Sequence, residues 1–106
     1  MTSDLSAFSL EHGAFKLDPV TYMVVVDGRR IALTRLEFRL LHYLMAHVAS
    51  ACTHREILRG VWGYDDQEAA NVVAACIWRL RRKIEADPAH PHHIVTARRR
   101  GYTFKP

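Results

Sequence analysis

The strongest constraint on the fold is the segment from Asn71 to Ile84, NVVAACIWRLRRKI, which has the pattern of one amphipathic helix. Four apolar residues recur in it at spacings of four, three and four, and such residues share one side of a helix that turns by about 100° per residue. They are Val73, Ile77, Leu80 and Ile84. The chain must therefore build a core against which this stripe packs.

The opposite side of the same helix carries small, aromatic and basic groups. Asn71, Ala75, Trp78 and Arg82 lie near the pole opposite the stripe, with Ala74, Arg79 and Arg81 on its flanks. Lys83 adds a fourth cation to the C-terminal end of the helix. An exposed Trp78 has three readings: contact with DNA, contact with a partner protein, or packing against Arg82 or a neighbouring hairpin.

A basic hairpin is predicted further along the chain. Asp87-Pro88 ends the helix, and residues 94–97 and 101–104 have the composition of two short strands. Between these strands stand Arg98, Arg99 and Arg100. We call residues 94–104 the wing.

Positive charge is concentrated in the C-terminal part of the sequence. Residues 79–106 hold eight Lys and Arg against two acids, a net charge of +6, whereas residues 1–78 hold seven against nine, a net charge of −2. A basic segment on an otherwise near-neutral domain is typical of a protein that binds a phosphate backbone. Basic runs also occur on solvated surfaces without a ligand, so charge alone favours nucleic acid only weakly.

The length of 106 residues gives room for one hydrophobic core and one domain. We assign residues 1–7 to a tail or linker remnant and residues 8–106 to the domain. The sequence lacks a secretory signal, and its longest apolar runs are far shorter than the about 20 residues needed to span a bilayer. We therefore expect a cytoplasmic protein that does not associate with membranes. Cys52 and Cys76 are expected to be buried free thiols.

The first third of the domain predicts a small antiparallel sheet. A strand-like run begins at Phe8, and others cover residues 14–18, 22–26 and 30–33. Asp27-Gly28 is a strong signal for a two-residue hairpin turn.

Two capping boxes mark the starts of two further helices. Thr34 with Glu37, and Thr53 with Glu56, place an N-cap hydroxyl three residues before a glutamate, so that each can bond the other's backbone amide. The first helix should end near Ala49-Ser50, with a stripe made of Leu36, Leu40, Tyr43, Leu44 and His47 or Val48. The second should end near Gly63 and bury Ile57, Leu58 and Val61, and Trp62 is expected in the core. A sheet, three helices and a basic hairpin predict an α+β fold of the winged helix-turn-helix type.

Four groups of residues carry a resemblance to a known family. They are Leu33-Thr34-x-x-Glu37-Phe38-x-Leu40-Leu41, Thr53-x-x-Glu56-Ile57-Leu58 with Val61-Trp62-Gly63, Val73-x-x-x-Ile77-x-Arg79-Leu80-Arg81-x-Lys83-Ile84, and Ile94-x-Thr96-x-Arg98-x-x-Gly101-Tyr102-x-Phe104. In these motifs the chain resembles, from about Phe8 to Phe104, the OmpR/PhoB-type DNA-binding effector domains of bacterial two-component response regulators.

The resemblance implies sequence-specific binding of double-stranded DNA, in transcription regulation at the output of a phosphorelay. The third helix would read the major groove, and the wing would contact an adjacent minor groove. The implied DNA-binding residues are Asn71, Val72, Ala74, Ala75, Trp78, Arg79, Arg81, Arg82, Lys83, Arg98, Arg99, Arg100 and Tyr102. The loop of Gly63, Tyr64, Asp65, Asp66, Gln67 and Glu68 would contact RNA polymerase. A receiver domain is expected in the full-length protein; the alternative is an effector domain that stands alone. The isolated domain should be a monomer that forms a weak homodimer on tandem half-sites.

This sequence departs from the family pattern at the positions that would read bases. The N-terminal half of the third helix is mostly apolar, and Asn71 alone has a side chain that can make two hydrogen bonds to adenine. Arg99 stands in a wing tip where the family commonly has glycine. We expect fewer direct contacts to bases and stronger binding to the DNA backbone. The alternative is a winged-helix protein-interaction module whose apolar face no longer binds DNA specifically.

Enzymatic chemistry has no candidate residues. The sequence lacks a glycine-rich phosphate loop, a nucleophile motif and paired carboxylates on one face, so we predict a protein that is not an enzyme. His90, His92 and His93 lack a second ligand cluster at a recognised spacing, and neither a metal nor another cofactor is predicted. When protonated, these histidines would add to the positive potential near the wing.

Overall fold

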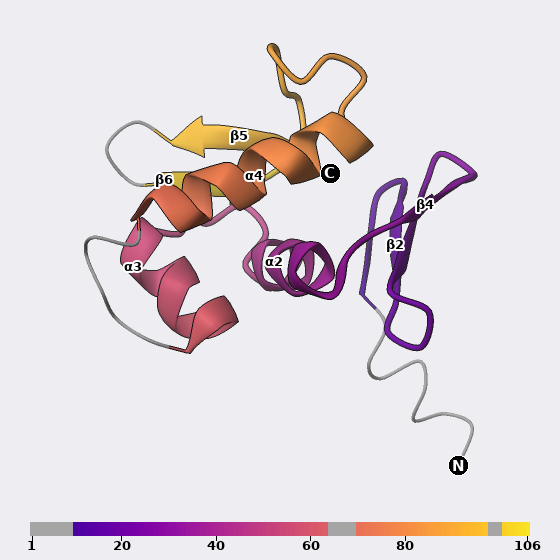
Figure 1. The fold of residues 1–106 in the computed structure, drawn as a ribbon. Coiled ribbons are helices and arrows are strands. Elements are labelled where there is room, and N and C mark those ends of the chain that lie inside the picture. Colours follow the sequence, from indigo (N-terminus) through magenta and orange to yellow (C-terminus); the bar gives the residue numbers. More distant parts are fainter. Residues whose placement is uncertain (1–9, 64–69, 98–100) are drawn as a thin grey trace.

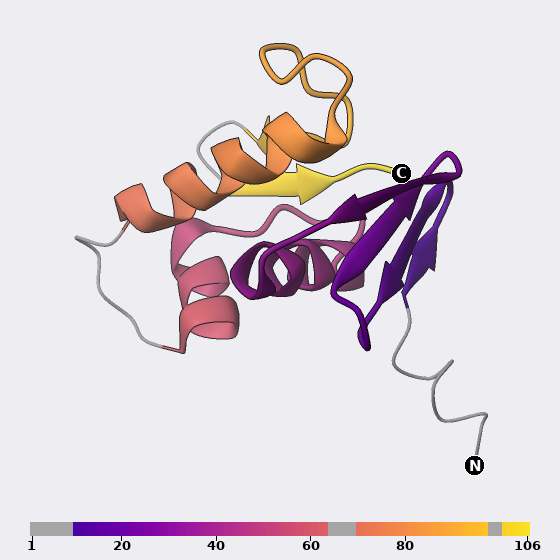
Figure 2. The same cartoon turned by 45° about the vertical axis from the view of Figure 1, so that its right-hand side comes forward.

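The computed structural model describes residues 10–63, 70–97 and 101–106, and it has the architecture of a winged helix (Figure 1). A four-stranded antiparallel sheet comes first, then three helical segments, then a two-stranded hairpin. Helix α2 lies between the sheet and α3, while α4 and the hairpin lie side by side across them (Figures 1 and 2). The predicted α+β winged helix-turn-helix is confirmed.

The sheet has the strand order β1-β2-β3-β4, with every neighbouring pair antiparallel. Its strands are β1 (Glu11–His12), β2 (Phe15–Asp18), β3 (Met23–Val26) and β4 (Arg29–Ala32). The predicted turn at Asp27-Gly28 joins β3 to β4, and both of its residues have positive φ, 51° and 81°. Such angles define the type of two-residue turn that matches the twist of a hairpin. The run predicted to begin at Phe8 starts outside the described residues.

Both capping boxes are present, and they set the starts of two helices. The hydroxyl of Thr34 accepts from the Glu37 amide at 3.2 Å, and Glu37 Oε1 accepts from the Thr34 amide at 2.8 Å. Thr53 and Glu56 repeat this pair of bonds at 3.0 and 2.9 Å. The first box opens α2 (Arg35–Ala46), and the second opens α3 (His54–Ile57), which continues as the π-helical turn η1 (Leu58–Trp62).

Helix α2 ends earlier than predicted and buries a wider face. It stops at Ala46, because the His47 amide bonds to Leu44 O and Ala49 turns the chain with φ 67°. The buried residues of the helix are Glu37, Phe38, Leu40, Leu41, Leu44 and Met45. Of the two alternatives predicted for the end of the stripe, His47 is exposed and Val48 is partly buried. Leu36 and Tyr43 are also only partly buried. Contacts with α4, η1 and β6 surround the helix on more sides than a single stripe would cover.

The third helix, α4 (Ala70–Ile84), docks by the predicted stripe. Val73, Ile77, Leu80 and Ile84 are all fully buried or nearly so. In the preceding helical segment Ile57, Leu58 and Val61 are also buried as expected, whereas Trp62 is only partly buried at the edge of the core.

The wing strands are β5 (Ile94–Ala97) and β6 (Gly101–Phe104). The ring of Phe104 meets that of Phe15 edge-on with centroids 5.0 Å apart, so the wing and the first sheet share one core. Cys52 and Cys76 are buried free thiols, as predicted, and burial raises the pKa of both. Among the helices of the described residues, none combines the length and apolar character needed to span a bilayer.

Candidate nucleic-acid interface

The outer face of α4 is exposed and mixes apolar, polar and basic side chains. Its exposed members among the predicted residues are Asn71, Val72, Ala74, Ala75, Trp78, Arg79, Arg82 and Lys83. Val72 and Trp78 retain 38% and 48% of their accessible surface, which makes them two of the three large apolar side chains that are exposed in the described part of the chain. The helix is held with this face outward because its opposite side is buried in the core.

Lys83 is tied to a neighbouring helix. Its ammonium lies 2.6 Å from Oε1 of Glu37, whose side chain is only 3% exposed. Burial raises the pKa of Glu37, but hydrogen bonds from Lys83 and the Thr34 amide more than offset this, so the pKa lies below its ordinary value. The positive charge of Lys83 is therefore largely neutralised within the protein.

Arg81 is also engaged within the protein. Its Nε donates to the carbonyl of Ile94 at 2.9 Å, and its Nη2 donates to Thr96 Oγ1 at 3.0 Å. The guanidinium carbon also lies 5.5 Å from the centre of the Tyr102 ring. The other two cations predicted at the end of α4, Arg79 and Arg82, are exposed, and neither forms a salt bridge with another of the described residues.

Tyr102 is the second residue of β6, and 8% of its surface is exposed. Its ring meets the His54 ring edge-on at 5.3 Å, and its backbone exchanges two hydrogen bonds with Cys52, of 2.8 and 2.9 Å. Gly101 precedes it with φ 95°, and a Cβ there would collide with the backbone of Cys52. This burial differs from the open position that the assignment of Tyr102 to the DNA surface implies.

The loop between α4 and the wing is organised by a buried carboxylate that the sequence analysis missed. Glu85 is 7% exposed and accepts hydrogen bonds from the backbone amides of His92, His93 and Ile94 at 2.8 to 3.2 Å. Its position directly after the amphipathic helix is the only signal that the sequence offers. The histidine rings have separate partners here, since His90 bonds to Asp87 and His93 to the carbonyl of Lys105.

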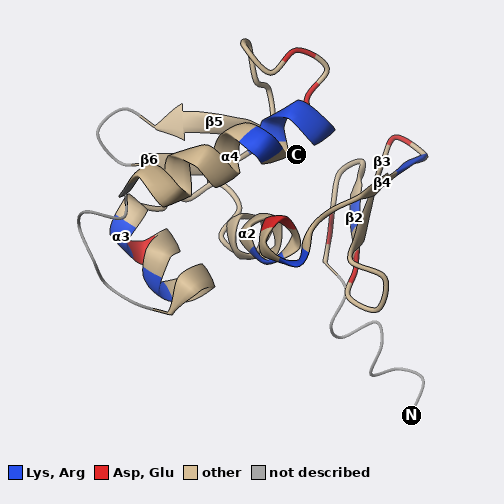
Figure 3. Ribbon diagram, viewed as in Figure 1, with Lys and Arg blue, Asp and Glu red and all other residues tan. Residues whose placement is uncertain are grey.

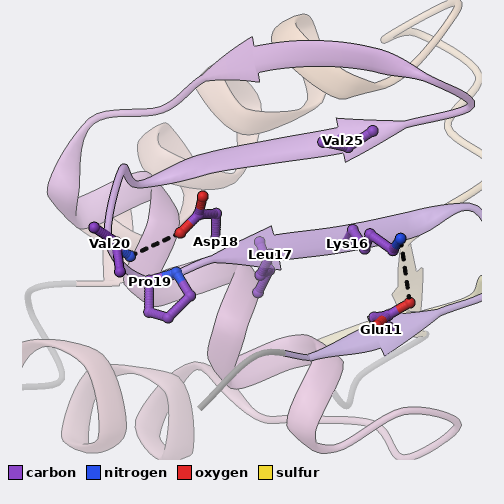
Figure 4. A pocket seen from close by; sticks show the side chains of 7 residues that line it. All are labelled: Glu11, Lys16, Leu17, Asp18, Pro19, Val20 and Val25. Atoms are coloured by element: carbon purple, nitrogen blue, oxygen red, sulfur yellow. Dashed lines mark hydrogen bonds and ion pairs between the residues drawn. The ribbon is translucent and has the colours of Figure 1, made fainter. Parts of the chain in front are cut away.

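Basic residues surround a surface hollow at the C-terminal end of α4, which is the blue end of that helix in Figure 3. The hollow, of about 470 Å³, is lined by Thr34, Glu37, Arg79, Arg82 and Lys83. A second hollow of about 460 Å³ lies on the four-stranded sheet, where Lys16 pairs with Glu11 at 3.8 Å and Asp18 accepts from the Val20 amide (Figure 4). None of the predicted site residues lines this second hollow.

Some predicted site residues lie outside the described residues. These are Arg98, Arg99 and Arg100 of the wing tip, and Tyr64, Asp65, Asp66, Gln67 and Glu68 of the predicted polymerase loop. Gly63 is described; it is exposed and ends η1 in a left-handed conformation with φ 84°.

Solved structures with the same fold include several response-regulator proteins. The RstA DNA-binding domain of Klebsiella pneumoniae, solved in complex with the RstA box, is 28% identical with a TM-score of 0.82, and the match covers 92% of this chain and 96% of that one. The CpxR DNA-binding domain of E. coli is 28% identical with a TM-score of 0.76 over 91% of this chain and 94% of that one. DrrB of Thermotoga maritima, an OmpR/PhoB homolog, is 31% identical with a TM-score of 0.79 over 92% of this chain, which spans 44% of DrrB.

The family model for the C-terminal domain of transcriptional regulatory proteins matches residues 28–104. This match begins at the β3–β4 turn and includes every helix and both wing strands. The chain therefore belongs to the family of C-terminal domains of transcriptional regulatory proteins, which is the OmpR/PhoB type of winged helix and is not enzymatic.

Proposed function

We propose that this domain binds double-stranded DNA sequence-specifically, as the output domain of a two-component transcriptional response regulator. The observation that carries the proposal is the exposed outer face of α4, held beside the wing in a fold shared with a domain solved on its DNA box. An α-helix fits the major groove of B-DNA, and a neighbouring hairpin can then reach an adjacent minor groove.

Base reading falls to the N-terminal half of α4. The amide of Asn71 is suited to adenine, and the small apolar side chains of Val72, Ala74 and Ala75 are suited to the methyl group of thymine. Trp78, one turn further on, would pack against the sugar–phosphate backbone or a base. These residues supply little that could bond to guanine, so we expect sites that are rich in A and T.

Backbone contacts fall to five cations. Arg79 and Arg82 are exposed on α4, and Arg98, Arg99 and Arg100 are the wing-tip arginines. Arg81 and Lys83 are weaker candidates, because each is already bonded within the protein. Tyr102 is also a weaker candidate, because it is buried.

A salt titration tests this proposal. If about five phosphates are neutralised, the logarithm of the affinity should fall against the logarithm of salt concentration with a slope of about −4 to −5. A flat salt response, or no binding at low salt, would remove the DNA proposal.

The exposed Trp78 and Val72 support a second candidate, a surface that binds another protein. The affinity of an apolar interface changes little with salt concentration. A salt titration of binding to a protein partner should therefore be nearly flat, whereas that of binding to DNA should be steep. In the full-length protein we further propose a receiver domain that controls this one, and an RNA polymerase contact through residues 63–68.

A further inference from the structure

We propose that Arg81 is a positioning residue that fixes the wing relative to the reading face of α4, so that both elements meet DNA as one unit. The inference rests on the DNA binding proposed above. It gives Arg81 a role in orientation, whereas the basic pattern of the helix alone suggests a phosphate contact.

The first support is the pair of bonds from Arg81 to β5. Nε bonds to the carbonyl of Ile94, a fully buried residue at the start of the strand, and Nη2 bonds to the hydroxyl of Thr96 two residues later. A guanidinium is a rigid planar fork, so two bonds from it fix both the position and the angle of the group they hold. One side chain of α4 thereby fixes the direction of β5.

The second support is the contact of the same guanidinium with the other wing strand. Tyr102 is the register partner of Thr96, and its ring lies 5.5 Å from Arg81 Cζ. Its backbone is bonded to Cys52, in the connection between α2 and α3. The wing is thus attached to α4 through β5 and to the remainder of the helical core through β6.

These attachments have a physical consequence for recognition. A two-stranded hairpin is at best marginally stable by itself, and each wing strand has only four residues. If the hairpin pivots freely, binding of α4 in the major groove no longer places the wing at its own groove. The high effective concentration of the wing near that groove is then lost. A fixed angle preserves that gain.

Two substitutions separate orientation from charge. Arg81→Lys keeps the positive charge but loses the two-pronged geometry. Thr96→Val removes one acceptor of the wing, changes no charge, and keeps a β-branched side chain at an exposed strand position. The readouts are DNA affinity across salt concentrations and amide hydrogen exchange of the free protein.

We expect Arg81→Lys to weaken binding by about five- to tenfold and to make the salt slope shallower, because the wing arginines lose phosphate contacts although the charge at residue 81 is kept. Thr96→Val should change both quantities in the same direction by a smaller amount. Coupling is measured by adding Arg99→Ala. Arg99→Ala should lower the DNA affinity several-fold in the otherwise unaltered protein, but less than about twofold in the protein that already carries Arg81→Lys. The cost of Asn71→Ala should be the same in both backgrounds, because the helix still reads its bases when the wing is loosened.

Hydrogen exchange tests the attachment without DNA. The amides that pair β5 with β6 should exchange faster in both variants, while those in the middle of α4 keep their protection. Unchanged wing protection in both variants would overturn the proposal. So would wild-type affinity for Arg81→Lys, or an undiminished cost of Arg99→Ala beside it, because both mean that Arg81 acts through its charge. If the unaltered domain does not bind DNA, the proposed function fails, and hydrogen exchange alone decides whether Arg81 holds the wing.

Discussion

The ammonium of Lys83 lies 2.6 Å from Oε1 of Glu37, and this ion pair joins the end of α4 to the first turn of α2. The same carboxylate oxygen accepts the Thr34 amide of the capping box. One buried group thus sets both the start of α2 and the position at which α4 crosses it.

Replacing Lys83 with Met should lower the free energy of unfolding by about 1–3 kcal/mol, because it leaves a buried carboxylate without its charged partner. Chemical denaturation measures this loss. The matched control is Arg82→Met, which removes the neighbouring exposed cation and should leave stability within about 0.5 kcal/mol of the original. DNA binding should show the opposite order of effects: Arg82→Met should reduce the salt slope of the affinity more than Lys83→Met does. Equal effects of the two changes on stability would contradict this role for the ion pair.

Stability should fall in acid partly through Glu37. Its pKa is lowered in the folded state, so its contribution is fully present above the unfolded value, near 4.5, and is lost as pH falls through the lower folded value. Glu37→Gln should therefore flatten the loss of stability below about pH 4.5, as measured by denaturation at a series of pH values. Glu11→Gln, at a carboxylate that is 62% exposed, is the control and should leave the acid profile nearly unchanged. A profile for Glu37→Gln as steep as the original would exclude Glu37 as a source of acid sensitivity.

Asn71→Ala should cost about 1–3 kcal/mol of binding at a preferred site and little on random DNA, because it removes the one polar base contact expected from the reading face. The change is expected to relax the preference for adenine at one position. Site selection with the original and the altered domain measures both effects. Identical preferences would show that Asn71 does not read a base.

Thymine methyl groups should contribute to affinity through Val72, Ala74 or Ala75. Replacing the thymines of a preferred site with uracil deletes only these methyl groups, so affinity should fall while the salt slope stays the same. If the uracil duplex binds as tightly, specificity must come from the shape of the DNA.

Arg99→Ala and Arg100→Ala should each weaken binding by about 1 kcal/mol on every sequence alike, since a basic wing tip is expected to contact the backbone or a minor groove. Competition between a preferred site and random DNA gives the comparison. A shift in the preferred sequence would mean that the wing reads bases.

The isolated domain should be monomeric in sedimentation and should bind tandem half-sites spaced about 10 to 11 base pairs apart more tightly than one half-site. One recognition helix contacts few bases, and a second domain bound to the neighbouring half-site on the same face of the duplex adds further contacts. A tight dimer in the absence of DNA would contradict this expectation and would favour a protein contact for Trp78.

The sequence by itself determined the order of the elements and the buried face of α4. Thr34 and Thr53 predicted two helix starts, because a capping box forms between residues three apart. The stripe from Val73 to Ile84 predicted which side of α4 is buried, because helical periodicity is local. The ends of elements were less well predicted: α2 stops at Ala46, where the left-handed Ala49 soon redirects the chain.

Only the tertiary structure decided which polar groups of the basic helix face outward. Lys83 meets Glu37 across 46 residues, and Arg81 reaches Ile94 and Thr96 across 13 and 15. Residues this far apart meet according to how helices and strands pack, and no periodicity in the sequence encodes that distance. A run of four cations therefore looks uniform in the sequence, whereas the fold uses Lys83 to fix a helix, uses Arg81 to hold the wing, and leaves Arg79 and Arg82 exposed.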